Sequence, residues 1–596
     1  MTIDVVTAEI IRNALDTVSH EMGITIYRTA RSPIANESRD FATAVFDQYA
    51  RMVTQPHGAP MLMGSCKWSV HSILEDFQND LHPEDILINN DPYRGGSHLP
   101  DFTVCMPIFH EGEHVLFTAC RVHQADAGGG GGRPGGFNPL AREIWEESLR
   151  WPPLRIAEQG KLKEDLFEWL IANNRYPEWF RGDLLAMIAS CKVGARSIQE
   201  LISRYSVGAI HATCEHTLNY SERRFRQEIE SWPDGLYSGG SVVDGDGHYT
   251  FDVEVNADVT VKGSELIVDF SRSSPQTVGF LNSTLPTTWS WVFIALGSMV
   301  DESIPMNEGI LRPVTIIAPK GTLVNPFEPA PTGYSTITPG AEIAEAVTIA
   351  LSKAIPTLVG STWDKKPKYS ISGIDPRTGS PYISLNFVAH FSGDGATHGR
   401  DGWGGLPASK GDMTYTTVEA YETQYPHLIE EHEYVQDTCG AGQWRGGCGV
   451  KTVERIVDHE AFVTVIAWGA NHPSVGLCGG KPSSLNRVIL RYGEPEALSV
   501  EGGRAVEVKL PPNSLLCARR GGGGGWGDPL ARDPEWVLKD VVDGYISLDY
   551  ALNEHGVVMD QAVMRVNEEA TRERRKCLRD SLPKGTGMGA KEEALR

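Results

Sequence analysis

The sequence lacks several features that would assign it to a familiar class of protein. It has no uninterrupted apolar run of about twenty residues, the length that a membrane-spanning helix needs. Its first residues have no basic start followed by an apolar core, so we expect no export signal and a cytoplasmic location. Its 10 cysteines include no Cys-X-X-Cys pair, which argues against a zinc ribbon or a disulfide framework and for reduced thiols.

Positive charge is also scarce. There are 54 Lys and Arg residues against 77 Asp and Glu residues, and the formal net charge is −23. Such a surface repels nucleic acid and anionic lipid, so any anionic substrate must be held by local groups. The phosphate-binding pattern GxxxxGK[ST] is absent as well, so we do not expect this chain to carry the nucleotide chemistry.

The chain does have length and many loop-forming residues. Its 596 residues allow two to four domains or one elaborate domain with a large core. The 62 glycines and 36 prolines are typical of a loop-rich enzyme rather than a helical bundle.

The most informative segment is NDPYRGGSHLPD at residues 90–101, followed by RVHQADAGG at residues 121–129. Between them, two β-rich stretches (101–109 and 114–122) flank a short polar turn, which predicts a β-hairpin. The hairpin should pair residues whose numbers sum to roughly 223, with Asp101 beside Val122 and His123 at its open end.

Three metal-ligand side chains therefore gather at one rim: His98, Asp101 and His123. Pro100 stiffens the short arm between the first two. Two imidazoles and a carboxylate suit Zn²⁺, Mn²⁺ or Fe²⁺ and leave room for water or substrate. The alternative is that these histidines only cap strand ends. Their convergence through one hairpin, with glycine runs on both sides, favours a site.

Apolar periodicity predicts an α+β fold: a mixed N-terminal sheet covered by helices, a β-rich central and C-terminal part, and a helical C-terminal tail. We expect a metal-binding domain at 1–232, a β-rich domain with glycine-rich active-site loops at 233–532, and a helical segment at 533–596. Helices are predicted at 5–22, 64–77, 139–149, 162–172, 181–204, 213–231 and 341–354, and glycine-rich loops at 369–450.

At this point the motifs resemble a known family. The chain is similar to the hydantoinase B/oxoprolinase family, which includes subunits of acetone and acetophenone carboxylases. The resemblance rests on the two segments above and on three further motifs: ESLRWPP at 147–153, NEG at 307–309 with Arg312-Pro313, and GGGGGWGDP at 521–529.

This resemblance implies a multi-subunit, ATP-dependent enzyme whose ATP-binding fold lies on a partner, the hydantoinase A-type subunit. It also implies that His98, Asp101 and His123 are metal ligands and that Asp40 is a further acidic ligand. Asp126 would orient His123, and these two are the predicted catalytic side chains.

Two reactions are compatible with the resemblance. One is carboxylation of a ketone with bicarbonate and ATP to a 3-oxo acid; the other is ATP-dependent hydrolysis of a cyclic amide such as a hydantoin, 5-oxoproline or a lactam. Both need a Lewis acid. Gln124 and the PGGFNP segment at 134–139 depart from the commonest hydantoinase pattern, so carboxylation is the preferred expectation. A third interpretation, in which the metal only holds the fold of a scaffold subunit, fits three ligands and an open position less well.

Overall fold

A seven-stranded antiparallel sheet forms the centre of the N-terminal part. In this computed structural model, which describes residues 3–54, 58–129, 138–365, 367–386, 388, 392–405 and 413–581, the strand order is β2-β1-β5-β4-β3-β6-β7. The strands are β1 (Phe41–Asp47), β2 (Met52–Thr54), β3 (Ile86–Asn89), β4 (Asp101–His110), β5 (Glu113–His123), β6 (Leu154–Glu158) and β7 (Lys161–Leu162).

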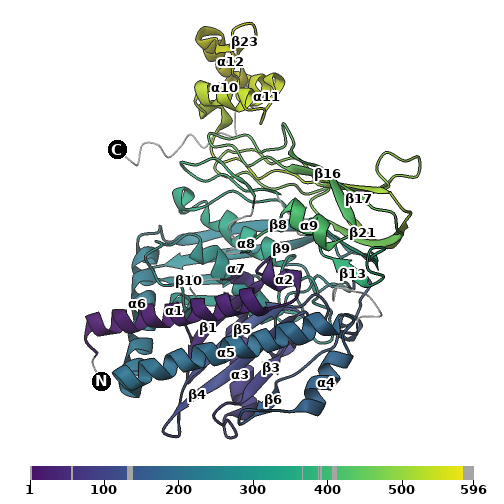
Figure 1. Ribbon diagram of the computed structural model, residues 1–596. Coiled ribbons are helices and arrows are strands. Elements are labelled where there is room, and N and C mark those ends of the chain that lie inside the picture. Colours follow the sequence, from purple (N-terminus) through teal and green to yellow (C-terminus); the bar gives the residue numbers. More distant parts are fainter. Residues whose placement is uncertain are drawn as a thin grey trace.

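Both faces of this sheet are buried because its side chains alternate between two hydrophobic clusters. On β1, Ala42, Ala44 and Phe46 belong to one cluster, whereas Phe41 and Val45 belong to the other. Long helices cover the second face: α1 (Val5–Thr29) and α5 (Pro177–Tyr205) run side by side across it (Figure 1). α3 (Pro60–Phe77) contributes apolar side chains to the first cluster and so covers the opposite face.

The shorter N-terminal helices are α2 (Pro33–Asn36), α4 (Glu164–Ala172) and α6 (Val207–Glu230). α1 begins at a side-chain cap: the Asp4 carboxylate accepts from the amide of Thr7 at 2.9 Å.

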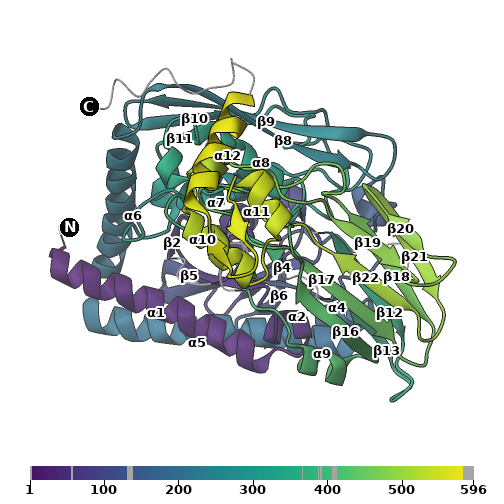
Figure 2. The same cartoon turned by 90° about the horizontal axis from the view of Figure 1, so that it is seen from above.

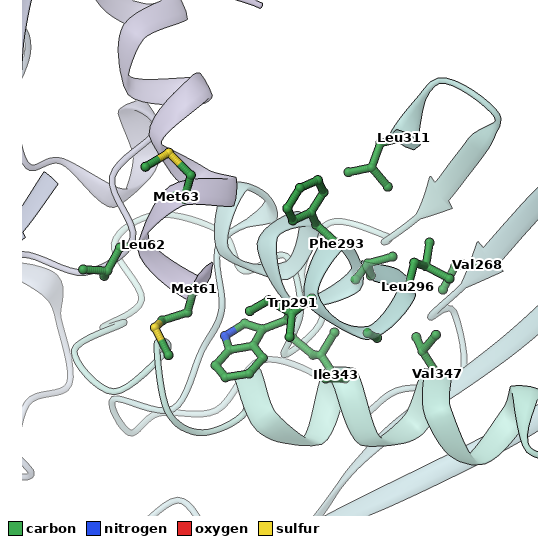
Figure 3. Close-up of a cluster of buried hydrophobic side chains, with 14 of the residues drawn as sticks. Met61, Leu62, Met63, Val268, Trp291, Phe293, Leu296, Leu311, Ile343 and Val347 are labelled. Carbon is green, nitrogen blue, oxygen red and sulfur yellow. The ribbon is translucent and has the colours of Figure 1, made fainter. Parts of the chain in front are cut away.

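The central part packs on the first face through α7 (Leu285–Gly297) and α8 (Gly340–Leu351). Figure 3 shows Met61 to Met63 of α3 beside Trp291 and Phe293 of α7, with Ile343 and Val347 of α8 below them. A four-stranded sheet in the order β11-β10-β9-β8 completes this layer; its strands are β8 (Gly235–Gly245), β9 (Phe251–Lys262), β10 (Glu265–Asp269) and β11 (Val314–Ile317).

Two further sheets share one core in the C-terminal part. One has the order β13-β12-β18-β21 and the other β16-β17-β22-β19-β20. Their strands are β12 (Lys368–Ile374), β13 (Pro381–Ser384), β16 (His427–Tyr434), β17 (Val450–Ile456), β18 (Ala461–Ala467), β19 (Arg487–Leu490), β20 (Leu498–Val500), β21 (Gly503–Leu510) and β22 (Leu515–Arg519). The short helix α9 (Val418–Gln424) precedes β16.

Three helices project from the β-rich end as a separate layer, seen at the top of Figure 1 and over the sheets in Figure 2. They are α10 (Pro534–Val542), α11 (Leu548–Glu554) and α12 (Glu568–Ser581). Val537, Ile546 and Ala551 from this layer share a small core with Cys439 and Cys448.

The predicted α+β class and the helical cover of the N-terminal sheet are confirmed. The N-terminal sheet is antiparallel throughout rather than mixed, and the parallel pair joins β10 and β11 of the central sheet. The helix predicted at 139–149 is wrong, since only the 3-10 turn Ile144–Glu146 forms there. Polar groups of this segment make loop contacts instead: Asn138 Nδ2 donates to the Glu146 carbonyl at 2.8 Å. Within 369–450, the described residues include strands β12, β13 and β16 and helix α9, and loops connect them as predicted.

The domain boundary at 232 stays a prediction. The larger core cluster includes Phe225 and Trp232 together with Val243 and Val255, so it continues across that position. Among the helices that the structure describes, none is long and apolar enough to cross a membrane.

Candidate metal centre

The hairpin forms at the predicted place. β4 and β5 are joined by Glu111 and Gly112, whose φ values of 49° and 85° are those of a two-residue primed turn. The register pairs Asp101 with His123 directly, so their side chains leave the open end on the same face.

The arm before β4 brings His98 to the same point. It starts with a short 3-10 turn, Pro92–Arg94, and reverses at Gly95, where φ is 94°. A Cβ at Gly95 would lie 2.2 Å from the Trp68 carbonyl carbon, so glycine is required both by the backbone conformation and by the close approach to α3.

The ligand atoms of His98, Asp101 and His123 all lie within 4.8 Å of one another, and all three residues are buried. His123 Nδ1 is 2.9 Å from Asp101 Oδ1, and His98 Nδ1 is 3.6 Å from Asp101 Oδ2. The two imidazole rings meet edge to face, with centroids 4.9 Å apart. Within the described residues this is the one group of three or more His, Cys, Asp or Glu side chains of such compactness.

The electrostatics favour the metal-binding protonation states. Burial lowers the pKa of His98 to about 3, against the attraction of Asp101, so its imidazole is neutral near pH 7. Burial alone would raise the pKa of Asp101, but His98, His123 and the Ser97 hydroxyl outweigh it and hold the pKa at about 2. A neutral imidazole and an ionised carboxylate are the forms that ligate metals.

Sequence reasoning missed two supporting residues. Ser97 donates its hydroxyl to Asp101 Oδ2, and the fully buried Arg121 lies behind it with Nη1 3.4 Å from Ser97 Oγ. Arg121 also donates to the Thr103 hydroxyl at 2.8 Å and to Ser69 of α3 at 2.7 Å. The available signal was spacing, because Arg121 precedes His123 by two residues and so shares its face of the strand.

Residues of the central and C-terminal parts reach the same arm. The Ser97 carbonyl accepts from Ser335 Oγ at 2.9 Å and from Thr287 Oγ1, at the start of α7, at 3.1 Å. Lys368, at the start of β12, lies close enough to act electrostatically on His98. The centre is therefore built at a junction of several parts of the chain.

Asp40 lies beside the centre but outside the compact group. Its carbonyl accepts from the His123 amide at 3.0 Å, and Phe41 after it pairs with Val122. The Asp40 carboxylate is not among the ligand atoms that lie within 4.8 Å. Its role as a further ligand stays a prediction.

Asp126 is engaged differently from the expectation. Its carboxylate accepts from Arg175 Nη1 at 2.8 Å and from the Arg175 amide at 2.9 Å, and the Gly128 amide is 3.3 Å away. These contacts fasten the loop that follows His123 to the segment before α5. Orientation of His123 by Asp126 stays a prediction.

The glycine run at 521–525 serves close backbone packing. A Cβ at Gly523 would lie 1.9 Å from the Asp394 carbonyl oxygen, and one at Gly524 would lie 2.1 Å from that of Val475. These glycines let several loops approach one another closely. Of the run at 128–132, only Gly128 and Gly129 lie within the described residues.

The donor set fits a divalent transition metal. Ligand atoms around one ion at about 2.1 Å lie roughly 3–4 Å from one another, close to the spacing of this group. Two imidazoles and one carboxylate suit zinc, manganese or iron and leave further coordination positions open. The identity of the ion does not follow from this donor set.

Comparison with known proteins agrees with this architecture. Over 575 residues the chain is 34% identical to caprolactamase subunit beta of Pseudomonas jessenii, covering 94% of this chain and 97% of that one. It is 27% identical to the acetophenone carboxylase delta subunit of Aromatoleum aromaticum, covering 85% and 81%. The crystal structure of the ATP-dependent caprolactamase from P. jessenii superposes with a TM-score of 0.90 at 32% identity, over 97% of this chain and 100% of that one.

The model of one protein family matches residues 4–529, which include the hairpin, the arm with His98 and the glycine run. The chain belongs to the Hydantoinase B/oxoprolinase family.

Proposed function

We propose that this chain is the metal-binding subunit of an ATP-dependent enzyme that hydrolyses a cyclic amide, with a lactam as the first candidate substrate. The observation that carries the proposal is the close similarity to the caprolactamase subunit along nearly the whole chain, combined with a buried His-Asp-His group. ATP would bind to a partner of the hydantoinase A type.

The residues of this chain would have three tasks. His98, Asp101 and His123 would hold one divalent ion, which when bound supplies a Lewis acid for a substrate oxygen. Ser97 and Arg121 keep the Asp101 carboxylate in place, so that the ligand geometry is set before the ion arrives. The ion pair between Asp126 and Arg175 holds the loop after His123 and limits its movement.

Carboxylation of a ketone with bicarbonate is the second candidate. It is favoured by Gln124 and the PGGFNP segment at 134–139, and by the similarity to the acetophenone carboxylase subunit. We rank hydrolysis first because the caprolactamase subunit is more similar and is covered more completely. Residues 134–137 of that segment lie outside the described residues, so only its sequence bears on the choice.

The test is to purify the chain in complex with its ATP-binding partner and to measure ATP consumption with two substrate sets. Lactams, hydantoins and 5-oxoproline form one set; acetone or acetophenone with labelled bicarbonate forms the other. Turnover with a cyclic amide and no need for bicarbonate supports the hydrolase. Label in a 3-oxo acid product contradicts it in favour of the carboxylase, and full activity of this chain without a partner contradicts both. A complex carrying His98→Ala is the negative control.

A further inference from the structure

We propose that a second site, away from the metal centre, binds a small carboxylate with an apolar chain. The site is the cavity of about 620 Å³ between the segment that precedes α5 and the edge formed by β12, β13 and β18. Figure 1 shows β13 close to the beginning of α5, where the N-terminal and β-rich parts meet. Cavities of this size at the junction of two parts of a chain are typical small-molecule sites.

Both apolar and polar side chains line the cavity. Ile374, Pro381 and Phe462 line it, and Phe462 and Ile374 are among the exposed large apolar residues of the chain. Arg175, His459 and Glu460 line it as well; Arg175 is paired with Asp126 at 2.8 Å, and His459 is a titratable imidazole that can gain a positive charge. Apolar side chains beside a guanidinium and an imidazole that can take up a proton fit an amphiphilic acid, whose charge the added proton balances.

A network of buried hydrogen bonds connects the cavity to Glu454. Tyr382, which lines the cavity, has its hydroxyl 2.7 Å from His459 Nε2 and 2.9 Å from His427 Nε2. His427 Nδ1 is in turn 2.7 Å from Oε1 of Glu454. Glu454 is fully buried and also accepts from the hydroxyls of Tyr421 at 2.6 Å and Tyr369 at 3.2 Å.

The hydrogen-bond partners of each group indicate where the protons lie in this network. His459 Nδ1 faces the Val457 carbonyl at 2.8 Å and must donate, so in the neutral ring Nε2 accepts from the Tyr382 hydroxyl. The Tyr382 oxygen then accepts from His427 Nε2–H, and His427 Nδ1 lies 2.9 Å from the Tyr421 hydroxyl as well as 2.7 Å from Glu454 Oε1.

Proton uptake by His459 would turn the Tyr382 hydroxyl toward the cavity. A proton from solvent on His459 Nε2 makes that atom a donor to the Tyr382 oxygen, so the O–H of Tyr382 loses its acceptor. The O–H can then donate to a ligand carboxylate, which would share the Arg175 guanidinium with Asp126. Binding of the anion and uptake of one proton are therefore coupled.

Other charged groups near His459 are engaged in ion pairs of their own. Burial lowers the pKa of His459 below its usual value, so the ring is neutral near pH 7 before the ligand binds. His427, Asp375 and Arg377 act on it electrostatically, and Asp375 is paired with Arg377 at 2.7 Å. Glu460 of the cavity wall is paired with Lys509, also at 2.7 Å.

The test is calorimetric titration of the full chain with hexanoate, near neutral pH, in two buffers of different ionisation enthalpy. Hexanamide, the neutral isostere, is the matched probe. We expect hexanoate to bind at least about tenfold more tightly than hexanamide, since a charge-assisted hydrogen bond is roughly twice as strong as a neutral one. The difference in observed binding enthalpy between the two buffers, divided by the difference in their ionisation enthalpies, should correspond to about one proton taken up per ligand.

Two variants and two controls localise the effect. Tyr382→Phe should lower the affinity for hexanoate about tenfold and abolish the proton uptake, and Arg175→Gln should weaken binding without abolishing the uptake. Tyr49→Phe, at an exposed tyrosine, and Arg181→Gln, on α5 outside the cavity, should change neither. No detectable hexanoate binding, equal affinity for hexanamide, or unchanged uptake in Tyr382→Phe overturns the proposal. Loss of binding in His98→Ala also overturns it, because the anion would then sit at the metal centre.

Discussion

At the scale of single residues, the proposed metal centre rests on the side chains of His98, Asp101 and His123. We expect His98→Ala, Asp101→Ala and His123→Ala each to remove most bound metal while the protein stays soluble, because each deletes a direct ligand bond. Elemental analysis per chain measures this, with His71→Ala, at an exposed histidine, as the control. Unchanged metal content in the His98 and His123 variants would place the site elsewhere.

Asp126→Asn should act more mildly. The asparagine keeps the shape but weakens the ion pair with Arg175 that holds the loop after His123. A loss of about 10–100-fold in metal affinity is the usual effect of disturbing a group that supports a ligand. A competitive chelator titration measures it. An unchanged affinity would show that this loop does not support the centre.

The buried carboxyl group of Glu147 should make the folding stability of the chain depend on pH. Burial raises its pKa to about 8, although the amides of Thr332 and Gly333 donate to it at 3.0 and 2.6 Å and oppose the shift. The folded chain therefore keeps a proton that the unfolded chain releases above about pH 4.3. The stability from this group is fully present below that pH and is lost as the pH rises toward about 8.

The variant Glu147→Gln should flatten this dependence. Melting temperatures measured across the same pH window should fall less steeply in the variant than in the parent. Glu143→Gln, at an exposed neighbour, is the control. Parallel profiles for Glu147→Gln and the parent would mean that the carboxylate is ionised in the folded chain.

At the scale of elements, the contact between α3 and α7 joins the N-terminal layer to the central layer. A Cβ at Gly64 would lie 2.5 Å from Ser290 Oγ and 2.8 Å from Ser290 Cα, so the two helices must move apart. Overpacking costs about 1–3 kcal/mol, against about 1 kcal/mol gained from helix propensity. We expect Gly64→Ala to be destabilising in chemical denaturation.

Gly23→Ala in α1 is the matched helical control. Its Cβ would meet the Phe41 ring at 3.3 Å and no backbone atom within 4 Å among the three nearest contacts. The propensity gain should then dominate, and the variant should be neutral or slightly stabilised. Equal effects of the two substitutions would contradict tight α3–α7 packing.

At the scale of the whole molecule, the C-terminal helices are fixed by a shared buried carboxylate. Asp540 of α10 accepts from Arg445 Nε at 2.8 Å and from Arg532 Nη2 at 2.8 Å, and Arg532 also pairs with Asp401 at 2.7 Å. Removing one partner of a buried ion pair typically costs about 3–5 kcal/mol. Asp540→Ala should therefore loosen residues 533–581 and make them the first site of proteolysis. Asp543→Ala, at an exposed position, should leave the digestion pattern unchanged.

The sequence alone determined the hairpin and the convergence of His98, Asp101 and His123. These features are local: the alternating strands, the short turn and the arm with Pro100 act within about 35 residues, so spacing rules reach them. The register at the open end differs by one from the predicted sum of 223, because an irregularity between Ile108 and Phe109 pairs Asp101 with His123. The family also followed from contiguous motifs. The same local rules failed at 139–149, where helical spacing of apolar residues did not outweigh loop contacts made by polar ones.

Only the tertiary structure decided what surrounds the centre. Ser335 and Thr287 reach Ser97 across 238 and 190 residues, and Arg175 reaches Asp126 across 49. The cavity lined by Arg175 and Tyr382 likewise joins residues that are far apart in the sequence. Such contacts depend on how whole layers pack, and one sequence carries no periodic signal for them. The candidate metal ligands could therefore be predicted from the sequence. The residues that hold their surroundings in place, and the second cavity, result from the packing of layers that are distant in the sequence.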